Sequence, residues 1–163
     1  MDQKKILYLM RHGEAARGGV TDFERALSPR GRGQIEAQIE QFKKVNGIRP
    51  DAVFCSTAKR TKETAQILQR LFKGVPVFYR ETLYLAPTGR LLDLVQGIDE
   101  VFARVLIIGH NPGLEQMVSL LDKKGALIPM GTADCVEMRL NIKKWCEVKA
   151  GTGEIKKIFL GFI

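Results

Sequence analysis

Ile6-Leu7-Tyr8-Leu9-Met10-Arg11-His12-Gly13-Glu14 is an apolar run that gives way abruptly to charged residues. Its apolar part predicts a buried strand over about Lys5–Met10, and the polar residues predict a turn directly after it. Ligands of α/β proteins bind at the carboxyl ends of parallel strands. An arginine beside a histidine offers an anion clamp next to a nitrogen nucleophile. We therefore expect an anion site at this strand end.

Polar residues follow two further predicted strands in the same way. His110 comes just after the apolar run Val105–Ile108, and Arg60 follows the run Ala52–Cys55 by a few residues. His12 and His110 are the two histidines of the chain. Because the ends of parallel strands share one edge of a sheet, both histidines and two arginines are expected to meet there.

Strand and helix patterns alternate along the chain. Helices are predicted from Pro29, with Ser28 as N-cap, to a stop at Asn46-Gly47; over Ala58–Phe72; after Gly89; and after Pro112, with Asn111 as N-cap. Further strands are predicted over Val75–Tyr79, at an edge or strand start because of Pro76, and over Arg104–Ile108, Val136–Ile142 and Ile155–Leu160. This alternation predicts an α/β fold, a three-layer sandwich with a mostly parallel central sheet flanked by helices, and an antiparallel last pair. The length of 163 residues fits a single domain over 1–163.

Bulk properties exclude several classes of protein. No apolar run approaches the ~20 residues that cross a membrane, and the start of the chain does not resemble a signal peptide, so we expect a cytoplasmic protein without a membrane partner. The three cysteines, Cys55, Cys135 and Cys146, lack metal-site spacing and are expected to be buried reduced thiols.

A net charge of +8 indicates an anionic partner. Nucleic acid, a phosphorylated metabolite and a phosphorylated protein are all candidates. The basic residues are scattered as pairs such as Lys43-Lys44 and Lys156-Lys157, and aromatic residues do not alternate with them. A stacking platform for single strands has little support, so no nucleic-acid partner is expected.

Arg60 indicates which anion the site binds. It falls in the first turn of a predicted helix, where the helix dipole is positive and a cation is unfavourable by ~0.3–1 kcal/mol. An anion bound at that helix end reverses the sign. Arg11 and Arg60 can each hold phosphate oxygens with a planar fork, so we expect phosphate or sulfate to bind here. A histidine beside it can attack phosphorus or donate hydrogen bonds to the transferred group.

Four motifs in order resemble those of the histidine phosphatase superfamily, which has the phosphoglycerate mutase-like fold. They are Arg11-His12-Gly13-Glu14, the segment Asp22 to Gly31 with Arg25-Ala26-Leu27-Ser28 at its centre, Ser56 to Ala65 with Arg60-Thr61, and Gly109-His110-Asn111. The resemblance covers nearly the whole length. It is greatest to the short phosphohistidine phosphatases called SixA-like.

The resemblance implies a role for each matching residue. His12 is the nucleophile that forms a transient phosphohistidine, and one of its ring N–H groups is expected to bond a backbone carbonyl. Arg11, Arg60 and His110 hold the phosphoryl oxygens and stabilise charge. The Asn111 backbone N–H and the Ser56 hydroxyl are further candidates for phosphate contact. No metal or other cofactor is implied, because these groups supply the positive charge.

The proton donor to the leaving group is less clear from the sequence. Larger relatives carry a glutamate after the third strand, and Glu81 lies in that region. In short relatives the acid comes just before a leucine, where this chain has Leu83 and Tyr84. Glu81 is therefore either a displaced general acid or a solvated charge at a strand end.

Length bears on the substrate. Only residues 80–103 separate the third predicted strand from the fourth. This connection is too short to add a large segment over the site, so an open, shallow site is expected. Such a site suits phosphohistidine on a protein, whose imidazole leaving group can arrive protonated. Hydrolysis of small phosphate esters such as sugar phosphates is the alternative among enzymes. A non-catalytic phosphate-binding module is the alternative outside them, although binding alone does not require a nucleophile at His12.

Overall fold

The computed structural model describes residues 4–18, 20–45 and 48–161. Within these ranges the strands are β1 (Lys5–Arg11), β2 (Ala52–Ser56), β3 (Val77–Arg80), β4 (Arg104–Gly109), β5 (Cys135–Leu140) and β6 (Gly153–Phe159). The α-helices are α1 (Pro29–Lys44), α2 (Lys59–Leu68), α3 (Thr88–Gln96) and α4 (Gly113–Leu121). Three short 3-10 turns are η1 (Asp22–Glu24), η2 (Glu81–Leu83) and η3 (Trp145–Glu147).

The six strands of the described residues form one sheet in the order β3-β2-β4-β1-β5-β6. β3, β2, β4 and β1 run parallel, whereas β5 is antiparallel to β1 and to β6. The predicted mostly parallel sheet and its antiparallel last pair are confirmed. Arg11 pairs with Gly109, so the residues that follow them, His12 and His110, leave adjacent strands at the same level.

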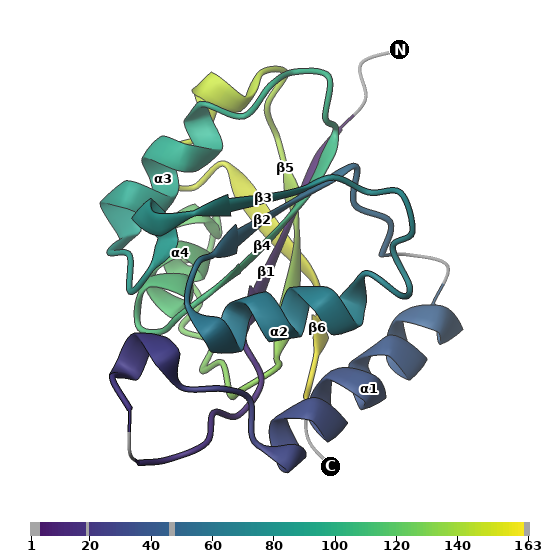
Figure 1. Cartoon of the computed structure of the whole chain (residues 1–163). Coiled ribbons are helices and arrows are strands. Elements are labelled where there is room, and N and C mark those ends of the chain that lie inside the picture. The colour runs from purple at the N-terminus through teal and green to yellow at the C-terminus, as the bar shows by residue number, and fades with distance from the viewer. Residues whose placement is uncertain (1–3, 19, 46–47, 162–163) are drawn as a thin grey trace.

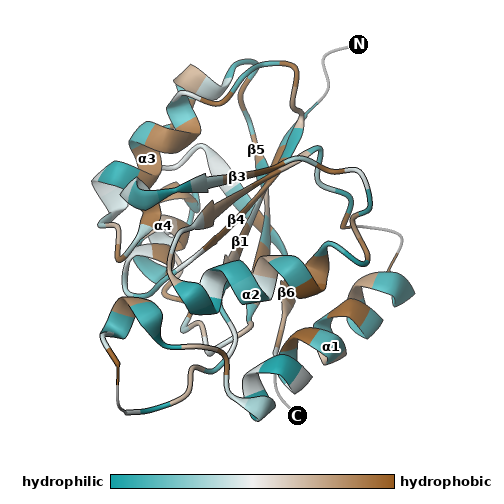
Figure 2. Ribbon diagram, in the orientation of Figure 1, coloured by the Kyte–Doolittle hydropathy of each residue, from teal (hydrophilic) through white to brown (hydrophobic). Residues whose placement is uncertain are grey.

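Helices cover both faces of this sheet (Figure 1), as the alternation of strands and helices predicted. Leu7 and Leu9 of β1 point into the apolar cluster with α3 and α4, while Tyr8 and Met10 point into the cluster with α1 and α2. The apolar stripes of the helices face the sheet, and their polar sides face outward (Figure 2). Burial on both faces explains why the first strand is a continuous apolar run rather than an alternating one.

Several predicted boundaries were wrong. α2 ends at Leu68, not at Phe72, and residues 69–73 form turns. Phe72 still packs against Phe42 from within these turns, so its apolar side chain does not require a longer helix. Pro112 is the N-cap of α4, and the Asn111 side chain has other partners, so the predicted cap at Asn111 is wrong. The Ser28 cap is confirmed, since Ser28 Oγ accepts from the Gly31 N–H at 3.0 Å. The predicted stop at Asn46-Gly47 lies outside the described residues.

The cysteines differ in their surroundings. Cys55 and Cys135 are buried free thiols as expected, but Cys146 is exposed, which corrects the prediction. It lies in η3, where the neighbouring Trp145 takes the inward position and donates from Nε1 to the Phe102 carbonyl at 2.8 Å. Across the described parts of the chain, every helix is too short or too polar to cross a membrane.

The loop that follows β1 is packed directly on α1 and α2. Gly13 N–H donates to Thr64 Oγ1 at 3.2 Å, and Glu14 N–H donates to Gln34 Oε1 at 2.9 Å. Gly31 lies so close that a Cβ added there would be 2.1 Å from the Glu14 carbonyl oxygen. A side chain at position 31 therefore has no room unless the backbone after His12 moves.

Gly31→Ala is expected to destabilise the protein by ~1–3 kcal/mol, the usual cost of forcing extra volume into a packed site. At ~2–4 °C per kcal/mol for a chain of this size, the thermal midpoint should fall by several degrees. Gly89→Ala is the matched control, because a Cβ there meets nothing within 4 Å on the surface of α3. Equal midpoints for the two variants would contradict the close packing of α1 on the loop.

Candidate active site

His12 lies at the centre of the edge formed by the carboxyl ends of the parallel strands. Its backbone is held on both sides, since His12 N–H donates to the Gly109 carbonyl and Ala133 N–H donates to the His12 carbonyl. Its ring Nδ1 lies 2.7 Å from the Gly13 carbonyl oxygen, which can only accept, so Nδ1 carries the proton. Nε2 is then left with its lone pair. The expected bond from His12 to a backbone carbonyl is present.

Burial keeps the His12 ring neutral. The residue is 7% exposed, and burial lowers the pKa of His12 to about 4, with the Arg60 charge acting in the same direction. At neutral pH the ring therefore has an unprotonated Nε2 at all times. This is the state that a nitrogen nucleophile requires.

Arg60, in the first turn of α2, lies beside both histidines. It is 3% exposed, and its Nε donates to His12 Nε2 at 3.3 Å. Its Nη2 lies 3.4 Å from His110 Nδ1. One edge of the guanidinium thus faces the two ring nitrogens that border the site. The predicted meeting of Arg60 with both histidines is observed.

His110 follows β4 and is 3% exposed. Arginine only donates, so His110 Nδ1 is the acceptor toward Arg60 and Nε2–H donates to Ser56 Oγ at 2.8 Å. Burial lowers the pKa of His110 to about 3, and the neighbouring His12 adds to this effect. The ring centroids of the two histidines are 5.2 Å apart. The His110 ring is thus neutral at neutral pH, and a phosphoryl anion placed against Nδ1 would favour a proton there.

Arg11 completes the group. Its Nη1 donates to the Met130 carbonyl at 3.1 Å, while its Nε is buried without a hydrogen-bond partner among the described residues. A buried donor without a partner is uncommon in proteins and is expected where a ligand supplies the acceptor. A cavity of about 570 Å³ opens here. It is lined by Arg11, His12, Glu14, Ala15, Ala16, Arg17, Arg25, Ser28, Arg60, Leu85, His110, Asn111 and Thr132.

Comparison with known proteins identifies this constellation. The family described as the Histidine phosphatase superfamily (branch 1) matches residues 7–101, more than half of the chain. The chain belongs to the histidine phosphatase superfamily. The matched range contains His12 and Arg60, and the structure adds His110 from the next strand.

Solved structures within the superfamily share the fold. A protein of Agrobacterium tumefaciens, described as a candidate phosphohistidine phosphatase SixA, is 25% identical, with a TM-score of 0.82 over 95% of this chain and 97% of that one. The protein histidine phosphatase SixA complexed with tungstate is 21% identical, with a TM-score of 0.78 over 96% and 97%. Mycobacterial glucosyl-3-phosphoglycerate phosphatase is 17% identical, with a TM-score of 0.68 over 98% and 100%.

The two further residues expected to touch phosphate differ in their surroundings: the Ser56 hydroxyl has other partners, whereas the contact of the Asn111 backbone N–H with phosphate stays a prediction. Ser56 Oγ bonds His110 and accepts from the Ala58 N–H, so it orients the histidine and does not line the cavity. Asn111 lines the cavity, but its Nδ2 donates to Glu115 Oε1 and to the Met130 carbonyl. The side-chain N–H groups of Asn111 are thus occupied.

Glu81 does not reach the cavity. It begins η2, its side chain is exposed, and within the described residues that side chain has no hydrogen bond or ion pair. The structure therefore gives no geometric support to Glu81 as the general acid. The strand β3 ends one residue earlier, at Arg80, and Glu81 follows it into an exposed 3-10 turn.

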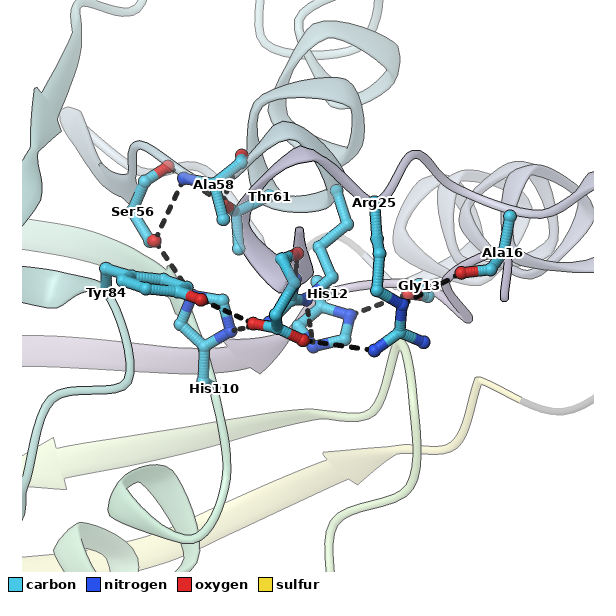
Figure 3. Close-up of polar contacts among 11 residues, drawn as sticks. His12, Gly13, Ala16, Arg25, Ser56, Ala58, Thr61, Tyr84 and His110 are labelled. Atoms are coloured by element: carbon cyan, nitrogen blue, oxygen red, sulfur yellow. Dashed lines mark hydrogen bonds and ion pairs between the residues drawn. The ribbon is translucent and has the colours of Figure 1, made fainter. Parts of the chain in front are cut away.

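The structure brings two unassigned residues to the site, Asp22 and Tyr84, of which Figure 3 labels Tyr84 beside His110. Asp22 Oδ2 accepts from Arg60 Nη2 at 3.1 Å and from the Tyr84 hydroxyl at 2.5 Å. The Tyr84 ring lies edge-on to His110, with centroids 5.4 Å apart. Asp22 stands at the start of its motif in the sequence, and Tyr84 stands where short relatives carry the acid. These positions in the sequence mark both residues, but they do not indicate that Asp22 contacts Arg60 or that Tyr84 contacts His110.

Proposed function

We propose that this protein is a phosphatase that hydrolyses phosphohistidine on a protein through a phosphoenzyme on His12. One observation carries the proposal: the His12 ring is held by its Nδ1–H on the Gly13 carbonyl, with the lone pair of Nε2 beside Arg60. A phosphate-binding module needs the arginines but gains nothing from an oriented, neutral nucleophile.

In the first step, His12 Nε2 attacks phosphorus, and the bond from phosphorus to the substrate's imidazole nitrogen breaks. Arg11, Arg60 and a protonated His110 stabilise the charge on the phosphoryl oxygens, as preorganised donors do in other phosphoryl transfers. In the second step, water attacks the phosphorus, the bond to Nε2 breaks, and inorganic phosphate leaves. Arg11, Arg60 and His110 supply the charge stabilisation of both steps.

The surroundings of the cavity favour a leaving group that needs little help from an acid. Glu14 lines the cavity, but it accepts from Ser28 Oγ at 3.0 Å and from Arg30 at 2.8 Å. Asp22 lies beside the cavity, and the Tyr84 hydrogen bond, together with Arg60, lowers the pKa of its carboxyl to about 2. The Asp22 carboxyl is therefore ionised, and the Glu14 carboxylate oxygens are taken up by Ser28 and Arg30. An imidazole that carries its own proton leaves more readily from such a site than an alkoxide does.

A comparison of substrates tests this proposal. The protein is incubated with a histidine-phosphorylated phosphotransfer domain, a phosphoserine peptide and glucose 6-phosphate, and released phosphate is measured. We expect kcat/KM for phosphohistidine to exceed the others by ~100-fold or more, since an alkoxide departs poorly without a proton donor. Turnover of glucose 6-phosphate alone would contradict the proposed substrate. Turnover of none of them would contradict the proposed activity.

A further inference from the structure

Asp22 holds the edge of Arg60 that points away from the histidines. The Asp22 backbone carbonyl accepts from Arg60 Nη1 at 2.7 Å, and its carboxylate accepts from Nη2 at 3.1 Å. Two oxygens of one residue thus engage the Nη1–Nη2 edge. The partner is unusual because Asp22 lies in a three-residue turn and its side chain is 45% exposed, whereas that of Arg60 is 4% exposed.

The adjacent Nε–Nη2 edge of the same guanidinium, which shares Nη2 with the first, faces the reacting atoms. Nε points at His12 Nε2 at 3.3 Å, and Nη2 lies 3.4 Å from His110 Nδ1. A guanidinium is planar and its five N–H groups have fixed directions, so an anchor on one edge sets the direction of the other. The contacts of Asp22 therefore aim the Nε–Nη2 edge at the space between the two rings.

Further groups keep the Asp22 carboxylate in place. Tyr84 donates its hydroxyl to Oδ2 at 2.5 Å, and Arg25 Nη1 donates to Oδ1 at 3.1 Å. Arg25 also bonds the Ala16 carbonyl, which ties the two arms of the loop together. The Tyr84 ring is wedged edge-on between Phe23 and His110 (Figure 3 shows Tyr84, His110 and Arg25). An exposed turn would lose order without these bonds.

We propose that Asp22, held by Tyr84 and Arg25, is a positioning residue that aims the inner edge of Arg60 at the transferred phosphoryl group. The inference rests on the proposed function, because it assigns a phosphoryl group to the space between His12 and His110. Asp22 takes one N–H of Nη1 and one N–H of Nη2, so the phosphoryl oxygens can bind Nε–H and the second N–H of Nη2 without displacing it. The role differs from that of a general acid and from that of a plug that competes with phosphate.

Asp22→Ala provides the first test, with phosphohistidine turnover and inorganic phosphate binding by calorimetry as readouts. We expect kcat/KM to fall by ~10- to 100-fold and phosphate binding to weaken, because a charged hydrogen bond is worth ~1.5–3 kcal/mol. Asp22→Asn retains one oxygen for Arg60 and should recover part of the loss. Glu24→Gln is the matched control, since Glu24 lies in the same turn and its side chain makes no hydrogen bond or ion pair with the described residues; it should match the wild type.

A double-mutant cycle with Arg60→Lys separates positioning from a merely structural role. Lysine has no second edge to be held, so Asp22→Ala should cost little further activity in an Arg60→Lys background. Tyr84→Phe keeps the ring against His110 but removes the hydroxyl, and a ~3- to 10-fold loss in the same direction is expected. Independent, multiplicative losses from Asp22 and Arg60 would overturn the inference.

The rival roles give different results. Tighter phosphate binding or faster turnover by Asp22→Ala would identify a competing plug and overturn the proposal. A loss that grows with the basicity of the leaving group, measured with p-nitrophenyl phosphate and phenyl phosphate, would identify a general acid and overturn it as well. If the wild type and Glu24→Gln are both inactive on every substrate, the proposed function fails, and phosphate affinity still decides the role of Asp22.

Discussion

Replacing His12 with alanine is expected to lower phosphohistidine turnover by ~10⁴-fold or more, the scale on which loss of a covalent nucleophile usually acts. The reason is geometric. Arg11, Arg60 and His110 remain to bind the phosphoryl group, but no other nitrogen lone pair borders the cavity at the position of Nε2. Phosphate release by the variant, measured in single turnovers, checks the expectation.

The His12→Ala variant should remain folded and should still bind inorganic phosphate. The arginines and His110 do not depend on the His12 ring for their own anchors, which are the Met130 carbonyl, Asp22 and Ser56. Loss of turnover with retained phosphate binding would separate chemistry from recognition. Turnover within ~10-fold of the wild type would contradict a nucleophilic role for this residue.

Mild acid is expected to destabilise the phosphate-free protein strongly. Burial lowers the pKa of His12 to about 4 and that of His110 to about 3, whereas an unfolded chain keeps both near 6.5. Below about pH 6.5 the unfolded state binds protons that the folded state refuses, so stability is full above that pH and falls as pH decreases. The loss between pH 7 and pH 5 should be roughly 4 kcal/mol for the two groups together, measured by urea unfolding.

Because the chain has two histidines, the pH dependence of the free energy of unfolding can be assigned to each of them by substitution. His110→Gln keeps a group that can donate to Ser56 and should reduce the pH dependence by about half. Inorganic phosphate should restore stability at pH 5, because a bound anion favours protonation of His110 on Nδ1. Chloride at equal ionic strength serves as the control. An unchanged slope in His110→Gln would contradict the buried neutral state of that histidine.

His12, His110 and Arg60, the residues proposed to carry the chemistry, could be predicted because they lie at the ends of regular elements. The apolar runs before His12 and His110 specify neighbouring parallel strands, and the alternation with helices places both strand ends on one edge. The position of Arg60 follows in the same way from a strand and the helix after it. Periodicity fixes such places because each element must bury a face.

Residues in irregular segments could not be placed by the same reasoning. Asp22 contacts Arg60 only because the loop after His12 folds back over the cavity, and no repeating pattern encodes that path. Asparagine is a preferred N-cap residue, but the Asn111 amide donates instead to Glu115 and to the Met130 carbonyl. Pro112 is therefore the N-cap, and α4 begins at Gly113. Glu81 has the right sequence distance for an acid, but the chain direction after β3 leaves it in solvent.

The central claim is a covalent bond between phosphorus and His12, and trapping the phosphoenzyme tests it most directly. The protein is mixed with a histidine-phosphorylated domain, quenched in alkali within milliseconds, digested and mapped by mass spectrometry. We expect one phosphoryl group on the peptide that contains His12, stable in alkali and lost in acid, and absent from His12→Ala. Active turnover with no phosphoenzyme, or with an acid-stable phosphoryl group on another residue, would contradict the claim.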